Sequence, residues 1–202
     1  MIVLGVTGSM AMGKSTITKM LRLIYRIPVW DADQAVRDLL VSDDELIQEI
    51  AIMYPQVMVN GKIDRSLLRS KAFEDEDCLV TLERLIHEKA FSQGIQFLSK
   101  MHRLGVPLCV FDVPLLFEAG WDRVCTYTVL VYAPTFIQRQ RLQKRPDLNE
   151  AKIERILKRH WSLDQKKALA SYEIQTGLSK WNTFRQLSSI IKDVKSKQVH
   201  DA

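Results

Sequence analysis

The sequence has few of the features that mark secreted, membrane-spanning or disordered chains. Its 202 residues contain only three cysteines, Cys78, Cys109 and Cys125, with no C-x-x-C pair, which indicates neither a disulfide framework nor a cysteine-rich zinc site. No uncharged apolar run reaches the roughly 18 residues of a membrane-spanning helix, and the apolar start lacks the basic residues of a secretory signal. We therefore expect a soluble, cytoplasmic protein with no membrane partner and with buried thiols.

Glycine and proline are also sparse, at 8 and 6 residues, which excludes a collagen-like or largely disordered chain. The apolar share of 47% and the charged share of 26% are those of ordinary globular proteins. A chain of this length is sufficient for one α/β domain with its own core and one or two small insertions.

The net charge of +5 is concentrated in one part of the chain. The segment from Arg139 to Lys167 holds ten basic and four acidic residues, so it accounts for +6 and the rest of the chain for −1. Such a segment suggests an anionic partner, either a polyphosphate ligand or a nucleic acid. A solvated helix with ion pairs four residues apart, such as Glu154 with Lys158, is the simpler explanation for any single residue.

Apolar runs and helical spacing predict alternating strands and helices. The expected strands cover residues 2–6, 27–30, 108–111, 127–132 and 172–175, and the expected helices cover residues 15–25, 33–40, 135–144, 149–170 and 184–194. From about residue 34 to 105 only helical patterns occur, and Asn60-Gly61 marks a turn among them. This stretch is longer than a simple crossover between parallel strands requires.

The sequence GSMAMGKS at residues 8–15 fits the pattern G-x-x-x-x-G-K-[ST] between the first expected strand and helix. Gly8 and Gly13 let the backbone curl so that its N–H groups point at phosphate oxygens, next to the positive end of a helix dipole. Lys14 adds a charge for the β and γ phosphates, and the hydroxyl of Ser15 is a ligand for Mg²⁺. The residues expected to contact the nucleotide are Gly8, Ala11, Met12, Gly13, Lys14, Ser15 and Thr16.

These elements together predict an α/β fold of the P-loop NTPase type, a doubly wound parallel sheet of about five strands. We expect a single domain over residues 1–202. Its core would comprise about 1–33, 106–134 and 168–202, interrupted by a helical, substrate-binding insertion at about 34–105 and by a basic helical lid at about 135–167.

Three aspartates follow expected strands: Asp31 and Asp33 after the second, and Asp112 after the third. Ligands of open α/β sheets bind outside the carboxyl ends of the strands. A carboxylate there has two uses in phosphoryl transfer, taking a proton from an attacking hydroxyl or holding Mg²⁺. The alternative for Asp31 or Asp33 is to cap the following helix.

Several motifs resemble those of the dephospho-CoA kinase family, in the same order along the chain up to about residue 170. Besides the phosphate loop they are DAD at 31–33, NGKIDR at 60–65, LERLIH at 82–87, DVPLLFE at 112–118 and the stretch 139–145. The resemblance implies transfer of the γ-phosphate of ATP to the ribose 3′-hydroxyl of dephospho-CoA, the last step of coenzyme A synthesis, with Mg²⁺ present.

The resemblance also implies roles for single residues. Asp33 resembles the general base of the family, and Asp31 beside it would support Mg²⁺ or orientation. His87 matches a histidine near the substrate, although its position beside Leu85 and Ile86 is also that of a packed or surface histidine. Arg65 matches a phosphate or substrate contact, and Asp112 matches a carboxylate at the metal. Arg145 resembles a lid arginine that neutralises the transferring group, with Arg139 and Arg141 as weaker candidates. The expected catalytic residues are therefore Asp33, Lys14 and Arg145; the substrate contacts are Asp31, Asp33, Arg65, His87 and Asp112; and the metal ligands are Ser15 and Asp112.

The chain departs from the family pattern at several positions. Ser9, Ala11 and Met12 stand where the family has Gly, Gly and Ser, so we expect altered nucleotide affinity with binding retained. Glu88 replaces a proline after His87, and residues 175–177 read QTG in place of the usual acidic or Asn-rich strand end.

Two other functions are compatible with the phosphate loop. A nucleoside or nucleotide kinase has the same core and differs in its acceptor. A nucleic-acid-binding module would use the basic segment against a phosphate backbone, but the segment contains only one aromatic residue, Trp161, which counts against stacking on single strands. We therefore expect a small-molecule substrate, no nucleic-acid partner, and a monomer or weak homo-oligomer.

Overall fold

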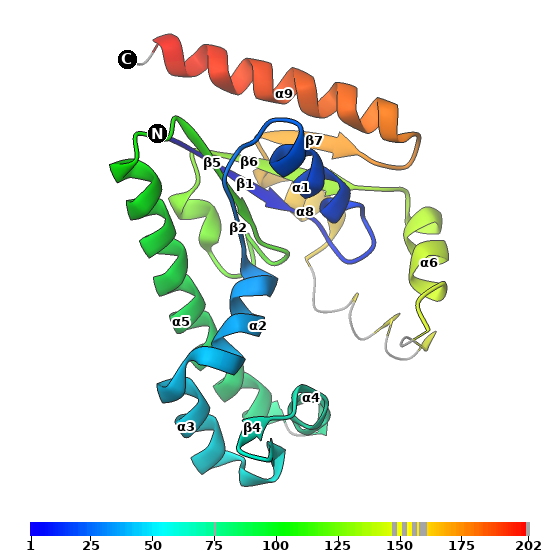
Figure 1. Cartoon of the computed structure of the whole chain (residues 1–202). Helices are drawn as coiled ribbons and strands as arrows, with labels where there is room; N and C mark the ends of the chain where they lie inside the picture. The colour runs from blue at the N-terminus through cyan, green and yellow to red at the C-terminus, as the bar shows by residue number, and fades with distance from the viewer. Residues whose placement is uncertain (75, 147–148, 151–152, 155–156, 158–160, 201–202) are drawn as a thin grey trace. The chain divides into compact units, whose positions relative to one another are not determined.

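The computed structural model describes residues 1–74, 76–146, 149–150, 153–154, 157 and 161–200 (Figure 1). The chain divides into two compact units, residues Asp31–Lys100 and the remainder. Each unit is described separately below. Within the described residues, no helix is both long and apolar enough to cross a membrane.

The larger unit is built on a five-stranded sheet with the order β2-β5-β1-β6-β7. The strands are β1 (Ile2–Thr7), β2 (Val29–Asp31), β5 (Leu108–Asp112), β6 (Tyr127–Tyr132) and β7 (Tyr172–Gln175). The pairs β1–β5, β1–β6 and β6–β7 are parallel. All residues of β1 and β5 are buried, which explains their continuous apolar sequence. The predicted doubly wound α/β fold is confirmed.

Helices α1 (Lys14–Leu23) and α9 (Lys180–His200) cover one face of this sheet (Figure 1). Ile17 and Leu21 of α1 and Leu187 and Ile191 of α9 pack against alternate residues of the strands. Their spacing of four places each pair on one helix face. This layer fixes the start of α1, and with it the loop that precedes the helix.

Helix α9 is longer than the predicted helix at 184–194. Its start is set by Ser179, whose hydroxyl accepts a hydrogen bond from the N–H of Asn182 at 3.1 Å and whose carbonyl accepts from Thr183. A serine at this position caps a helix.

The opposite face of the sheet packs against an aromatic cluster and a short helix. Trp30 stacks on Trp121 with ring centroids 5.0 Å apart, and Phe111 of β5 contacts both rings. Trp121 begins the short 3₁₀ helix η2 (Trp121–Val124). Gly5 of β1 is required here, since a Cβ atom would lie 2.7 Å from the sulfur of Cys125.

The basic segment contains two described helices, α6 (Thr135–Gln143) and α8 (Leu163–Leu169). The single helix predicted over residues 149–170 is wrong, because Trp161 and Ser162 are not helical. Ser162 caps α8: its hydroxyl accepts from the N–H of Gln165 at 3.2 Å, and the Gln165 side chain accepts from the N–H of Ser162 at 2.9 Å. This reciprocal capping box starts a new helix.

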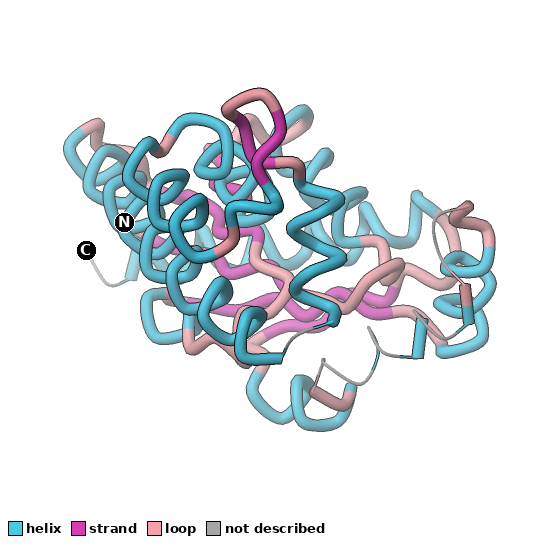
Figure 2. Tube along the Cα trace, turned by 90° about the horizontal axis from the view of Figure 1, so that it is seen from below, coloured by secondary structure: helices cyan, strands magenta, loops and turns pink. Residues whose placement is uncertain are grey.

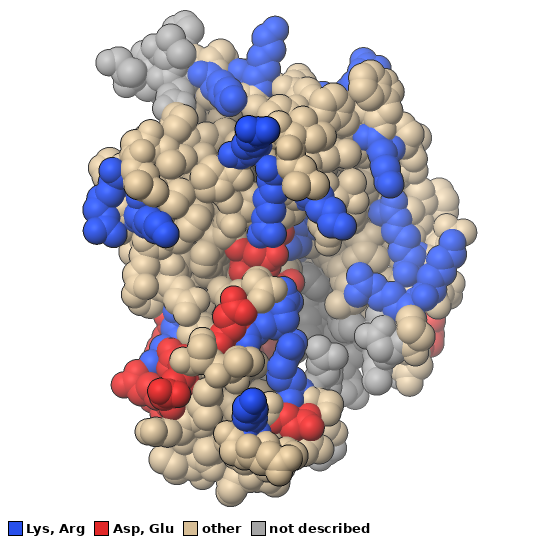
Figure 3. Space-filling view, viewed as in Figure 1, with Lys and Arg blue, Asp and Glu red and all other residues tan. Residues whose placement is uncertain are grey.

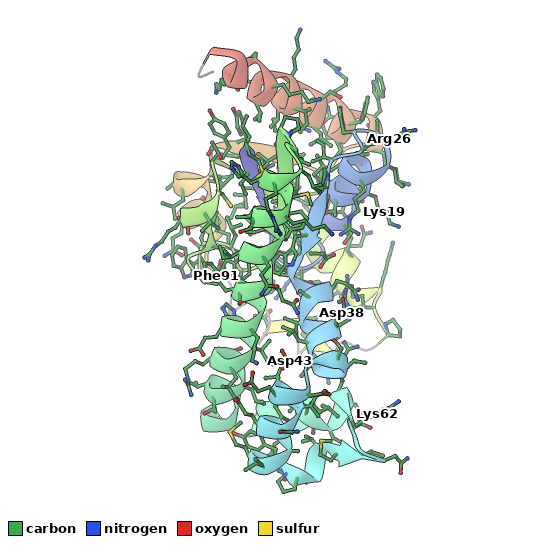
Figure 4. All side chains as sticks on the ribbon, turned by 60° about the vertical axis from the view of Figure 1, so that its left-hand side comes forward. Lys19, Arg26, Asp38, Asp43, Lys62 and Phe91 are labelled. Carbon is green, nitrogen blue, oxygen red and sulfur yellow. The ribbon has the colours of Figure 1, made fainter. Side chains whose placement is uncertain are left out.

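The smaller unit is mainly helical. It contains α2 (Ala32–Ser42), α3 (Asp44–Met53), the 3₁₀ turn η1 (Pro55–Val57), α4 (Arg65–Glu74) and most of the long helix α5 (Glu76–Arg103). Asp43, labelled in Figure 4, caps α3 by accepting a hydrogen bond from the N–H of Leu46 at 2.8 Å, and it also pairs with Lys89 of α5. This carboxylate therefore ties the start of α3 to α5.

The prediction that this stretch contains no strand is wrong. Strands β3 (Met58–Val59) and β4 (Lys62–Ile63) form an antiparallel hairpin, drawn in magenta in Figure 2. Its turn consists of Asn60 and Gly61, both in the left-handed region with φ of 51° and 73°. Asn-Gly is the preferred pair for a tight hairpin turn of this kind. Strands of two residues are too short to produce an alternating pattern.

Candidate active site

The loop between β1 and α1 requires both of its terminal glycines. At Gly8, a Cβ atom would lie 2.4 Å from the carbonyl oxygen of Val131 on β6. At Gly13, φ is +93° and a Cβ atom would lie 2.7 Å from Oγ1 of Thr176. Gly13 is also the N-cap of α1 and has no side chain to cap it. The first N–H groups of a helix have no partner inside the helix, so this end is suited to an anion.

Three successive carbonyl groups of the loop accept hydrogen bonds from side chains outside it. Met10 accepts from Nε2 of Gln138 at 2.9 Å, Ala11 from Nη1 of Arg141 at 3.0 Å, and Met12 from Oγ1 of Thr176 at 2.5 Å. We call Gln138, Arg141 and Thr176 the loop clamp. The sequence analysis assigned no role to Gln138. The three residues of the loop clamp come close to the phosphate loop only through the fold, so no local pattern marks them.

Met12 is buried at 7% exposure. Its sulfur accepts a hydrogen bond from the backbone N–H of Ala133 at 3.1 Å. The side chain that departs from the family pattern is therefore packed against the end of β6, and it anchors the loop to the sheet.

Lys14, the first residue of α1, forms an ion pair with Asp112 at the end of β5. Asp112 is only 3% exposed, and its second oxygen accepts a hydrogen bond from Oγ1 of Thr18 at 2.7 Å. A buried carboxylate is stable only when it is paired and hydrogen-bonded. The structure thus brings together two of the predicted site residues, and it adds Thr18, which the sequence analysis missed although it lies one turn after Lys14.

The donor atoms near this pair fit a magnesium ion. Ser15 follows Lys14 with an exposed side chain on the first turn of α1, and Asp112 offers carboxylate oxygens. Mg²⁺ prefers oxygen ligands and is commonly held by one or two protein groups together with substrate phosphates. Among the described residues, no group of three or more His, Cys, Asp or Glu side chains has the arrangement of a metal site.

Asp31 and Asp33 lie at the junction of β2 and α2. Asp31 is the N-cap of α2, and its side chain accepts a hydrogen bond from the N–H of Gln34 at 2.9 Å. The capping alternative from the sequence is therefore correct for Asp31. Asp33 is exposed on the first turn of α2.

Arg65 and His87 also belong to the smaller unit. Arg65 is the exposed first residue of α4. His87 is exposed on α5, which continues without interruption through Glu88. Replacing the family's proline with Glu88 therefore leaves the helix intact, and Glu88 forms an ion pair with Arg84 one turn earlier at 3.7 Å.

Asp64 precedes Arg65 and fixes the start of α4. Its carboxylate accepts hydrogen bonds from the hydroxyl of Ser66 at 2.5 Å and from the N–H groups of Ser66 and Leu67. These bonds, the Ser66 hydroxyl first, lower the pKa of Asp64. The last two residues of the NGKIDR motif thus end the hairpin and begin the helix that presents Arg65.

Basic side chains are prominent over α6 and α9 on the face shown in Figure 3. Arg139 is paired with Glu150 and Glu154 of the same segment, so part of its charge is neutralised locally, as the solvated-helix alternative requires. Arg145 follows α6 and is exposed, and its N–H donates to the carbonyl of Leu142. The pair Glu154–Lys158 lies outside the described residues at Lys158.

A buried ion pair anchors α8 to the segment after β5. Lys166 is 1% exposed, and its Nζ lies 2.7 Å from Oε1 of Glu118, the last residue of the DVPLLFE motif. The same oxygen accepts a hydrogen bond from the N–H of Trp161 at 3.1 Å. Lys166 also lines a pocket at the end of β6 together with Ser9 and Gln138. Neither Glu118 nor Lys166 was expected to have a role.

Comparison with known proteins gives a consistent result. The sequence model of the dephospho-CoA kinase family matches residues 2–179. The dephospho-CoA kinase of Novosphingobium aromaticivorans is 35% identical over 195 residues, 96% of each chain. That of Rhodopseudomonas palustris strain HaA2 is 35% identical over 176 residues, 87% of each chain.

Solved structures show the same fold. The protein TT1252 of Thermus thermophilus superposes with a TM-score of 0.80 at 28% identity, covering 95% of this chain and 97% of that one. The dephospho-CoA kinase of Campylobacter jejuni gives a TM-score of 0.72 at 20% identity, with 96% and 98% covered. A shikimate kinase from Bacteroides thetaiotaomicron gives 0.53 at 13% identity, again with 96% and 98% covered. From the match over nearly the whole sequence, the chain belongs to the dephospho-CoA kinase family.

Proposed function

We propose that this chain binds ATP at the loop of residues 8–15 and transfers its γ-phosphate to the ribose 3′-hydroxyl of dephospho-CoA, which gives coenzyme A. Members of the family to which it belongs are ATP-dependent kinases. The observation that carries the proposal is the cluster of Lys14, Asp112 and Thr18 directly behind the loop. This cluster places a cation and a carboxylate at the carboxyl ends of β1 and β5, where the parallel sheet binds its ligands.

Charge balance supports the role of each member of the cluster. Lys14 compensates the charge of the Asp112 carboxylate through their ion pair. When the phosphates draw Lys14 toward them, the buried carboxylate needs another cation. A magnesium ion shared by Asp112 and Ser15 would supply that charge and would neutralise phosphate oxygens during transfer.

We propose Asp33 as the general base that accepts the proton of the 3′-hydroxyl, with Arg145 stabilising charge on the transferring group. Asp31, which caps α2, positions the helix that carries Asp33. The smaller unit, with Arg65 and His87 on α4 and α5, is proposed to hold dephospho-CoA. Because the transition state of phosphoryl transfer is loose, these residues act mainly by positioning and by electrostatic stabilisation.

The acceptor is tested by measuring ATP consumption with Mg²⁺ and dephospho-CoA, beside adenosine and common nucleoside monophosphates. Phosphorus NMR identifies the product. We expect a 3′-phosphorylated product from dephospho-CoA and little turnover with the other acceptors. Turnover with only a nucleoside or nucleotide would retain the ATP site and refute the proposed acceptor.

The base is tested with Asp33→Asn, which preserves the shape of the side chain. We expect turnover to fall about 10²- to 10⁴-fold, the usual range for general base catalysis, while ATP affinity is unchanged. Asp38→Asn on the same exposed stretch of α2 (Figure 4) is the matched control and keeps normal turnover. Near-normal turnover of Asp33→Asn would exclude Asp33 as the base.

A further inference from the structure

Ala11 adopts a backbone conformation that its side chain disfavours. Its φ is +64°, in the left-handed region that residues with a Cβ atom rarely occupy. Glycine occupies this region freely. The loop therefore carries strain at Ala11, and something outside the loop has to hold the conformation.

The loop clamp supplies that restraint. Arg141 donates from Nη1 to the carbonyl of Ala11 at 3.0 Å, and from Nη2 to the carbonyl of Thr176 at 3.0 Å. It also contacts Oγ1 of Thr176 at 3.3 Å, and that hydroxyl donates to the carbonyl of Met12. The planar guanidinium thus joins two backbone carbonyls that lie 165 positions apart in the sequence, a geometry that the single ammonium of a lysine does not reproduce.

The positions of these carbonyls determine where the loop N–H groups point. No peptide bond among the described residues, which include the whole loop, is cis, and in a trans peptide the carbonyl and the following N–H lie on opposite sides. With the carbonyls of Met10 and Met12 directed at Gln138 and Thr176, the N–H groups of Ala11 and Gly13 point the other way. That is the orientation required for an N–H group that binds phosphate.

We propose that Arg141 is a positioning residue for the nucleotide: it holds Ala11 in its strained conformation and so keeps the phosphate loop preformed. This inference rests on the proposed use of ATP. It differs from neutralising charge on the transferring group, the role for which the family resemblance made Arg141 a weaker candidate than Arg145. When the loop is preformed, nucleotide binding does not have to supply the free energy that orders the loop. We therefore expect Arg141 to act mainly on ATP affinity.

The test is a double-mutant cycle of Arg141→Lys and Ala11→Gly, with ATP affinity measured by calorimetry. Arg141→Lys keeps the positive charge and removes the planar guanidinium that joins the two carbonyls. The free energy of hydrogen bonds from a charged group corresponds to a change of about tenfold to a hundredfold in an equilibrium constant. We therefore expect the dissociation constant for ATP to rise by about tenfold or more. In the Ala11→Gly background, where the loop conformation is unstrained, the same change should weaken binding by less than about threefold.

The exposed Arg185→Lys on α9 is the control and should leave ATP affinity unchanged. Equal losses in the two backgrounds would show that Arg141 does not act through Ala11, and an unchanged affinity of Arg141→Lys would also overturn the inference. If Arg141→Lys does not fold, Thr176→Val, which removes the hydroxyl shared by Arg141 and Met12, enters the same cycle. Failure of the wild-type protein to bind ATP would instead refute the proposed function.

Discussion

The ion pair between Lys14 and Asp112 makes a prediction about stability that is independent of any ligand. In Lys14→Met the carboxylate of Asp112 loses its paired cation and keeps its hydrogen bond from Thr18. The side chains of Lys14 and Asp112 are 14% and 4% exposed. Removing one partner of a buried pair costs about 3–5 kcal/mol, and the partial exposure of Lys14 places this pair at the lower end, about 3 kcal/mol.

Urea unfolding followed by the fluorescence of the four tryptophans measures this change. With a slope near 3 kcal/mol per molar urea, about the value for a chain of this size, the midpoint should fall by about 1 M. A second variant, Lys14→Met with Asp112→Asn, replaces both charges with neutral groups and should recover most of the loss. The exposed Lys19→Met on the same helix (Figure 4) is the matched control and should leave the midpoint unchanged.

Kinase turnover gives the second measurement on the same variants. If Lys14 contacts the phosphates as proposed, Lys14→Met loses most turnover, and the double variant does not regain it although its stability returns. A midpoint for Lys14→Met within about 0.3 M of the wild type would refute the ion pair as a stabilising feature. Recovery of turnover in the double variant would refute the role of Lys14 at the phosphates.

Three further predictions concern the rest of the chain. Glu118→Ala leaves Lys166 buried without its carboxylate partner and should lower the free energy of unfolding by about 3 kcal/mol or more. The double variant with Glu118→Gln and Lys166→Met should lose clearly less stability than the sum of the losses of the two single variants. Additive losses in denaturation would contradict the pairing. Burial raises the pKa of Cys109 to about 11 and of Cys125 to about 12, so in a variant with the third cysteine replaced, both thiols should resist a thiol reagent at pH 8 until urea is added. Because these pKa values are raised in the folded state, the free energy of unfolding should decrease as the pH rises from about 9 to about 11, and a flat profile there would exclude this linkage. The lowered pKa of Asp64 gives the opposite pH dependence. Its stabilising contribution is fully present above its ordinary pKa of 3.8 and is lost as the pH falls from there through the lowered pKa of the folded state. The helix content of the wild type should therefore fall more than that of Asp64→Asn between pH 6 and 3.

Features encoded by neighbouring residues were predictable from the sequence. The phosphate loop is a contiguous motif between a strand and a helix, and the spacing of Gly8, Gly13 and Lys14 follows from the geometry of one turn. Strands β1, β5 and β6 were predictable because burial on both faces makes them continuous apolar runs. The hairpin β3–β4 and the break at Ser162 were missed, because two-residue strands and a local capping box leave little periodic signal.

What only the tertiary structure decided are the contacts between residues far apart in the chain. Thr18 meets Asp112 across 94 positions, and Thr176 meets Met12 across 164. Such pairs form because the order of strands in the sheet brings the ends of β1, β5 and β7 to one edge, and no local pattern in the sequence records which side chains then face each other. The phosphate loop is therefore identified by eight consecutive residues of the sequence. The side chains that hold the loop in its conformation come from distant parts of the chain and are determined by the packing of the whole sheet.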